Sequence, residues 1–194
     1  TEGIGATNDS TFQKQLQAML LARGLDNVEV YNAGVSGSDP VFEYRLFIDK
    51  LTQYQPDLLI LTVNASDISD IKIRGGFERF QPDSTVRFNQ GPWFEKYYAH
   101  SRLVRVLVHD ILQYDWQFIS PAQQTSKNYR ANNILCQAAD SFSALSVIYG
   151  FKILLVFHPT MYEFKNRVPY EFTPLIRYCQ MKEIIYVSYY YNRQ

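Results

Sequence analysis

Four short stretches of the chain are apolar enough to be strands that are buried on both faces of a sheet. They cover residues 28–32, 57–63, 152–157 and 183–188. Between them, apolar residues recur at helical spacing, which predicts helices over residues 9–23, 40–54, 97–118 and 129–149, and one more between the last two strands. Helices that alternate with buried strands are typical of an α/β domain with a parallel sheet and right-handed crossovers.

The chain opens on a loop that runs into a helix, where such a domain normally opens on a strand. Thr1-Glu2-Gly3 occupies this position. In doubly wound sheets the first strand is usually central, and its carboxyl end borders the ligand crevice. We therefore expect a strand before Thr1 that completes the sheet and contributes to the site.

One connection is far longer than a crossover requires. About 90 residues separate the strand at 57–63 from the strand at 152–157, where a dozen suffice. Residues 74–94 within it are rich in Gly, Pro and aromatic residues, without helical spacing. Long loops in compact domains are often lids or binding loops. We predict one domain over residues 1–194, with an insertion at about 68–96 over the strand ends; a plain surface excursion is the alternative.

Composition excludes several classes of partner. Lys and Arg together number 19, as do Asp and Glu, so no basic excess indicates nucleic acid. No run approaches the ~18 apolar residues of a membrane span, which argues against stable membrane insertion. Two cysteines form no metal or disulfide pattern, and we predict no metal and no cofactor. Oligomeric state and compartment stay open, and an extracytoplasmic location would require an export signal before Thr1.

Polar loops follow two of the predicted strands at the same edge of the sheet. Asn32-Ala-Gly-Val-Ser-Gly-Ser-Asp39 precedes a helix, so its backbone amides are suited to an anion. The alternative for its glycines is a tight turn with positive φ. Val63-Asn-Ala-Ser-Asp-Ile-Ser-Asp70 follows the next strand. Its carboxylates, Asp67 and Asp70, could bind a divalent cation, but this spacing more often caps a helix.

These motifs resemble those of the SGNH (GDSL-type) hydrolase superfamily. The first family block, Gly-Asp-Ser-x-Thr-x-Gly, matches Thr1-Glu2-Gly3 at its last three positions. The second, Asn-x-Gly-x-x-Gly, matches Asn32-Ala-Gly34-Val-Ser-Gly37, and the third, Gly-x-Asn-Asp, corresponds to Asn64-Ala-Ser66-Asp67. Residues 98–105 are similar to the helix that follows the insertion in some members. The resemblance extends over nearly the whole chain.

The resemblance implies a serine ester hydrolase on a three-layer α/β/α sandwich with a flavodoxin-like parallel sheet. The nucleophilic serine would stand two residues before Thr1, and the Asp-x-x-His block of the triad would follow Gln194. The oxyanion hole would take the amide of Gly37 and a side chain of the third block. In that block Ser66 replaces the family asparagine, so either Ser66 or Asn64 would be the donor.

Four further residues are predicted to contact the substrate. Asp67 and His158 follow strand ends, and Phe77 and Trp93 belong to the predicted cap. The expected substrate is a small-molecule or carbohydrate O-acyl ester, or a lipid ester. Two alternatives stay open: a non-catalytic relative that binds in the same crevice, which Ser66 favours, and a flavodoxin-like phosphate or nucleotide binder that uses residues 32–39.

Overall fold

The computed structural model describes residues 7–83, 85–87, 91–167 and 171–188 in two compact units, Thr1–Ser38 and Asp39–Gln194. In the first unit a 3₁₀ turn, η1 (Asn8–Ser10), leads into helix α1 (Phe12–Ala22), which confirms the predicted helix. Gly24, with φ +83°, ends the helical stretch. The strand predicted over residues 28–32 is wrong. In the described part of the chain these residues pair with no strand, and an extended segment without a ladder is not a strand.

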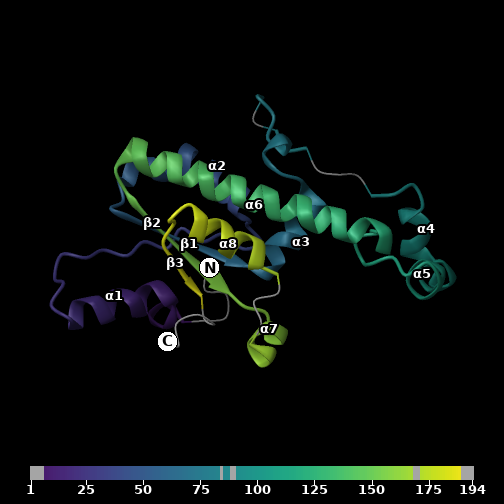
Figure 1. The fold of residues 1–194 in the computed structure, drawn as a ribbon, viewed down its shortest axis with the longest axis horizontal. Helices are drawn as coiled ribbons and strands as arrows, with labels where there is room; N and C mark the ends of the chain where they lie inside the picture. The colour runs from purple at the N-terminus through teal and green to yellow at the C-terminus, as the bar shows by residue number, and fades with distance from the viewer. Residues whose placement is uncertain (1–6, 84, 88–90, 168–170, 189–194) are drawn as a thin grey trace. The chain divides into compact units, whose positions relative to one another are not determined.

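The second unit contains a parallel sheet of three strands, β1 (Leu58–Asn64), β2 (Lys152–His158) and β3 (Tyr186–Ser188) (Figure 1). Their order is β1-β2-β3, and the register of β1 and β2 runs from Leu58 opposite Lys152 to Asn64 opposite His158. Three predicted strands and their parallel direction are thereby confirmed, although β3 begins later than expected. The protein is a mixed α/β protein.

Helices follow the predicted order, with different ends. The predicted helix 40–54 is α2 (Pro40–Leu46), continued by a π-helical turn, η2 (Phe47–Leu51), and a 3₁₀ turn, η3 (Thr52–Tyr54). Helix α6 (Pro121–Tyr149) begins at Pro121, before the predicted 129, because proline is pre-organised for a first helical turn. Helix α8 (Thr173–Met181) precedes β3 as expected, and α7 (Met161–Asn166) is a short addition after β2.

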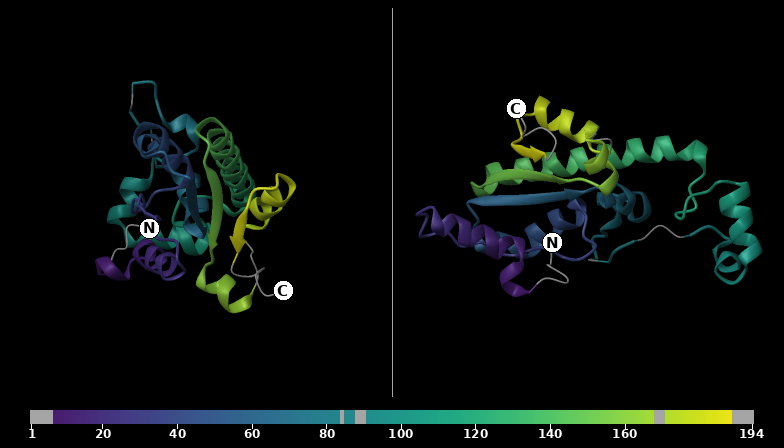
Figure 2. Two further views of the ribbon diagram at one scale, coloured as in Figure 1. Left: turned by 90° about the vertical axis from the view of Figure 1, so that its left-hand side faces the viewer. Right: turned by 90° about the horizontal axis from the view of Figure 1, so that it is seen from below.

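The single helix predicted over residues 97–118 is wrong. The structure has α4 (Glu95–His100), then α5 (Arg102–Val106) and a π-helical turn, η5 (Leu107–Ile111). Ser101 separates them with an extended backbone, φ −120° and ψ 119°, and its hydroxyl accepts a hydrogen bond from Val104 N–H, which caps α5. Apolar spacing alone does not detect a polar residue that starts a new helix. In Figures 1 and 2 these helices stand away from the sheet.

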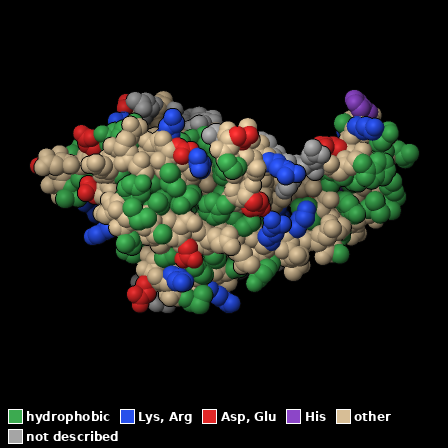
Figure 3. All heavy atoms as spheres, turned by 90° about the horizontal axis from the view of Figure 1, so that it is seen from above, with side chains coloured by type: hydrophobic (Ala, Val, Ile, Leu, Met, Phe, Trp, Pro, Cys, Tyr) green, Lys and Arg blue, Asp and Glu red, His purple; other side chains and the backbone are tan. Residues whose placement is uncertain are grey.

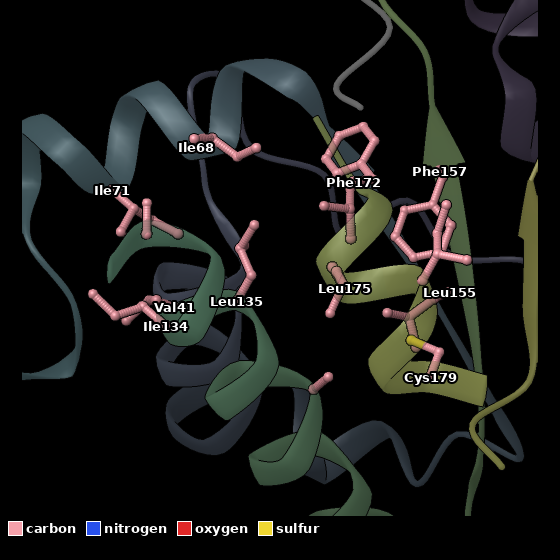
Figure 4. Close-up of a cluster of buried hydrophobic side chains, with 14 residues drawn as sticks. Val41, Ile68, Ile71, Ile134, Leu135, Leu155, Phe157, Phe172, Leu175 and Cys179 are labelled. Carbon is pink, nitrogen blue, oxygen red and sulfur yellow. The ribbon is translucent and has the colours of Figure 1, made fainter. Parts of the chain in front are cut away.

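Residues 65–74, for which the sequence predicts a loop and the start of an insertion, form helix α3 (Ala65–Arg74). Its buried Ile68 and Ile71 join the main core cluster with α2, α6 and α8. Figure 4 shows Ile71 close to Val41 and Ile134, whereas the side chains of α8 lie beside β2. The connection therefore returns to the core before the irregular part begins at Gly75, where a short 3₁₀ turn, η4 (Phe77–Arg79), follows.

Helices α2, α3, α6 and α8 pack on one face of the sheet. Alternate strand residues point to that face, among them Leu61, Val63, Leu155 and Phe157. A second core cluster includes Phe47 and Phe142. The intervening strand residues, such as Ile60 and Val156, belong to neither cluster in the described chain.

Candidate functional site

The carboxyl edge of the sheet brings together two of the predicted site residues. Asn64 ends β1, His158 ends β2, and they face each other in the parallel register. Neighbouring strands lie about 4.8 Å apart, so the two residues are adjacent on the sheet. His158 is exposed and Asn64 is half-buried. The crevice outside the carboxyl ends of parallel strands is where α/β folds bind ligands.

Helix α3, which follows β1, positions two further predicted site residues, Ser66 and Asp67. Asn64 is the N-cap, and Ser66 lies exposed in the first turn. The carboxylate of Asp67 accepts a hydrogen bond from the backbone N–H of Asn64 at 2.8 Å, as part of a capping box. Asp67 therefore caps α3, as the spacing of Asp67 and Asp70 favoured over a cation site.

The carboxyl group of Asp67 is an unusually weak acid. It is 2% exposed, and this burial raises its pKa to about 8, with the nearby carboxylates of Glu43, Asp39 and Asp70 adding to the rise and the Asn64 N–H opposing it. Burial likewise raises the pKa of Asp70, against the attraction of Arg74. A neutral Asp67 at pH 7 can donate a proton to a neighbouring acceptor, which an ordinary aspartate cannot.

A buried ion pair between Asp39 and Arg79 lies near the carboxyl group of Asp67. Asp39 is fully buried and caps α2 through hydrogen bonds from Val41 N–H and Phe42 N–H. The guanidinium of Arg79 donates to both of its oxygens at 2.8 Å and also to the Gly75 carbonyl at 3.1 Å. Arg74 stands 3.6 Å from Asp39 and 3.4 Å from Asp70.

Sequence reasoning missed this ion-paired network. The Ser-Asp-Pro stretch at 38–40 carries an N-cap signal for Asp39, but no local pattern indicates that its partner is Arg79, forty residues away. The pair joins the N-cap residue of α2 to the segment that follows α3.

A second capping box orders the loop next to His158. Thr160 caps α7, and its N–H and hydroxyl both donate to Glu163, at 2.8 and 3.0 Å. The other oxygen of Glu163 accepts the Glu171 N–H at 2.9 Å, although only 1% of the residue is exposed. The Thr-x-x-Glu spacing was a readable signal for this cap.

Gly37, the predicted backbone donor of the oxyanion hole, belongs to the first unit. It lies in a turn in which Ser38 N–H donates to the Val35 carbonyl at 3.2 Å, and its φ is +68°. Earlier in the same loop, the side chain of Asn32 accepts a hydrogen bond from Gly34 N–H at 3.0 Å. Glycine is needed at 37 because this left-handed conformation disfavours other residues.

The two aromatic residues predicted to contact substrate lie in different surroundings. Phe77 packs against the main core, with its ring 5.4 Å from that of Tyr44 in an edge-to-face arrangement. Trp93 is 81% exposed, and its ring meets those of the neighbouring Phe94 and Tyr97 edge-to-face. The structure therefore does not group the two rings, and their contact with a substrate stays a prediction.

The segment after Phe77 folds back on itself and borders a groove. Phe80 pairs with Val86, and Arg87 N–H donates to the Arg79 carbonyl at 2.8 Å. The groove, about 190 Å³ in volume, lies between this segment and α2, with Phe42, Arg45, Phe80 and Val86 in its walls. It contains no predicted site residue, and it is smaller than the ~300 Å³ at which ligand pockets usually begin.

Comparison of the chain with family models, curated proteins and solved structures returns no match in any of the three. Within the described ranges, no group of three or more His, Cys, Asp or Glu side chains is arranged to hold a metal ion. None of the described helices has the length and apolar character that crossing a membrane requires.

Proposed function

We propose that the protein is a serine ester hydrolase of the SGNH type, which forms an acyl-enzyme at the carboxyl edge of the sheet. The expected substrate is an O-acyl ester of a carbohydrate, another small molecule or a lipid. The sequence motifs of the two loops and the strand order of the sheet support this function.

The strand order of the sheet is the structural observation that supports the proposal most. A flavodoxin-like sheet has the order 2-1-3-4-5, with the ligand at the switch point beside strands 1 and 3. The parallel order β1-β2-β3 corresponds to strands 3-4-5, and the other edge of β1 pairs with no strand in the described part of the chain. We infer that the strand bearing the nucleophile pairs there, next to Asn64 and Ser66. A three-layer sandwich would further place helices over the face that Ile60 and Val156 share.

The third-block loop supplies the proposed oxyanion donor. Asn64 stands at the end of β1 beside His158, whereas Ser66 is exposed on the first turn of α3. The family resemblance assigns the second donor to the amide of Gly37. A donor aimed at the developing negative charge of a tetrahedral intermediate lowers the barrier to acyl transfer more than it strengthens substrate binding.

The roles of the remaining residues follow from their environment. His158, exposed beside Asn64, is assigned a contact with the alcohol or acyl part of the ester. Asp67 is assigned the positioning of Asn64, because its carboxyl group binds the backbone N–H of that residue. The general base would come from the Asp-x-x-His block, as the resemblance implies.

A fluorophosphonate probe tests the proposal, because it labels activated serines covalently. On the full-length protein, we expect one labelled serine two residues before Thr1 and hydrolysis of p-nitrophenyl acetate that the label abolishes. Labelling of Ser36 or Ser66 would overturn the assignment of the nucleophile. Binding of an ester without labelling or turnover would instead favour the non-catalytic relative.

The oxyanion donor is tested by comparing Ser66→Ala with Asn64→Ala. Loss of the true donor should reduce kcat about 10²–10³-fold. Ser66→Ala should leave stability within about 0.5 kcal/mol, since the side chain is exposed. Asn64→Ala should also cost about 1 kcal/mol as a lost N-cap, so stability and kcat must be measured together.

A further inference from the structure

The groove between α2 and residues 80–86, which we call the α2 groove, combines apolar and charged side chains. Phe42, Phe80 and Val86 supply its apolar surface, and Arg45 and Asp49 supply a pair of opposite charges. Small-molecule sites are typically apolar, with a few polar groups that fix the orientation of the ligand. The volume of about 190 Å³ equals that of about six water molecules, at about 30 Å³ each, so the occupant must be small.

Contacts within residues 79–86 hold the wall opposite α2 in place. Gln81 N–H donates to the Thr85 carbonyl at 2.9 Å, and the Arg79 guanidinium lies 4.9 Å from the centre of the Phe80 ring. Arg79 is itself fixed by two hydrogen bonds to Asp39, the N-cap of α2. This ion pair therefore links α2 to the opposite wall, and a groove that is formed in advance loses little conformational entropy when a ligand binds.

The charged pair in the groove retains hydrogen-bonding capacity. Nε of Arg45 donates to Oδ2 of Asp49 at 2.7 Å, and within the described part of the chain neither side chain makes another hydrogen bond. The edge of the guanidinium formed by Nη1 and Nη2 matches a carboxylate in bidentate geometry, and Oδ1 of Asp49 is an acceptor. The side-chain nitrogen of Gln81 donates to the Glu78 carbonyl at 3.0 Å, which leaves its amide oxygen as a second acceptor.

The balance of the two charges decides which ligand fits. An anion is attracted by Arg45 and repelled by Asp49, and a cation experiences the reverse. A zwitterion, whose two charges lie a few ångströms apart, pairs with both residues. On the face drawn in Figure 3, acidic and basic side chains are interspersed, and the chain has no net charge, so no extended field of one sign favours an ion over a neutral zwitterion.

We propose that the α2 groove binds a free α-amino acid with an apolar side chain, of about the size of leucine. The ligand carboxylate pairs with Nη1 and Nη2 of Arg45, its ammonium group pairs with Oδ1 of Asp49 and the amide oxygen of Gln81, and its side chain lies on the apolar surface. A peptide carries its terminal charges on different residues and does not fit this pair. Because the side chains of Arg45 and Asp49 are 49% and 41% exposed, water screens both contacts, and the Kd should be about 1 mM.

An NMR titration of the full-length protein with L-leucine measures this binding. Backbone amide signals of α2 and of residues 80–86 should shift and saturate with a Kd of about 1 mM. Isocaproate has the leucine skeleton without the ammonium group, and isoamylamine has it without the carboxylate. Each should bind at least about tenfold more weakly, because one charged residue of the groove then lacks its partner. Glycine, which lacks the apolar side chain, should also bind more weakly.

Substitutions in the charged pair test the same contacts from the side of the protein. Arg45→Met and Asp49→Asn should each weaken leucine binding at least about tenfold. Arg177→Met removes an exposed arginine of α8, outside the groove, and should leave the Kd unchanged. The series of ligands requires only the wild-type protein, so the test does not depend on the folding of any variant.

Four outcomes would overturn the proposal. They are the absence of shifts at about 50 mM leucine, which is about fifty times the expected Kd, shifts that lie only outside the α2 groove, equal affinity for leucine and isocaproate, and equal affinity of wild type and both groove variants. None of these measurements depends on ester hydrolysis, so the result is independent of the proposed function.

Discussion

The guanidinium of Arg79 binds the carboxylate of Asp39 through two hydrogen bonds of 2.8 Å, and both residues are buried. Bidentate geometry is the strongest form of this pair. Since Asp39 begins α2 and Arg79 follows α3, the pair joins two segments that border the strand ends.

Removal of Arg79 should destabilise the fold strongly. Arg79→Met leaves the charge of Asp39 buried, with only Arg74 at 3.6 Å, and should lower the free energy of unfolding by about 3 kcal/mol or more. Arg79→Met/Asp39→Asn should be less destabilised, because asparagine still caps α2 but carries no charge. Urea denaturation of the single and double variants measures the difference.

The surface pair of Arg45 and Asp49, with 2.7 Å between the charged atoms, provides a matched control. Both side chains are more than 40% exposed, so Arg45→Met should cost less than about 1 kcal/mol. Equal losses in Arg45→Met and Arg79→Met would show that burial does not govern the strength of the inner pair.

The raised pKa of Asp67 predicts a specific pH dependence of stability. The native carboxyl keeps its proton up to about pH 8, whereas the unfolded one loses it near pH 4. Between these values the native state binds one more proton than the unfolded state. This group therefore makes the protein less stable as pH rises from about 4 to 8, by at most about 1.4 kcal/mol per pH unit.

Asp67→Asn should remove that dependence, while its side-chain oxygen can still accept the Asn64 N–H. Chemical denaturation of wild type and variant at pH 5, 6, 7 and 8 gives the difference between them, which should shift steadily in favour of the variant. A difference that is constant with pH would mean that Asp67 is ionised throughout this range.

The turn at Gly37 sets a limit on how its amide is tested. Proline requires φ near −65°, whereas Gly37 has +68°, so Gly37→Pro would break the turn as well as remove the N–H. Gly37→Ala retains the N–H and should cost about 1–2 kcal/mol through left-handed strain. If the amide is an oxyanion donor, displacement of the turn in Gly37→Ala should lower kcat by tenfold or more, with KM little changed. Unaltered kcat in a folded variant would remove Gly37 from the site.

Phe77 and Trp93 should respond differently to truncation. Phe77→Ala removes a ring packed on Tyr44 and the core and should cost about 2–4 kcal/mol. Trp93→Ala removes an exposed ring and should change stability by less than about 0.5 kcal/mol. If residues 74–94 set ester selectivity, Trp93→Ala should change the relative kcat/KM for acetyl, butyryl and longer esters. Identical selectivity would leave no role for Trp93 in the substrate site.

Local signals in the sequence correctly predicted several elements. The apolar runs at 57–63 and 152–157 are strands in the structure, because continuous runs of Leu, Ile and Val favour a covered parallel sheet. Gly24 and Gly150, with φ of +83° and +77°, stop helices where expected. The helix over residues 65–74 also had a readable signal, Asn64-x-x-Asp67 before Ile68 and Ile71, but its polar residues looked like a loop.

The sequence by itself therefore determined the α/β character of the protein and the three parallel strands of its described part, since these depend on apolar periodicity and on turn residues close together in the chain. Only the tertiary structure decided that residues 28–32 are not a strand, that Arg79 meets Asp39, and that burial keeps Asp67 protonated. Strand pairing, a buried ion pair and a shifted pKa all depend on groups distant in sequence, and no local pattern specifies which distant group arrives.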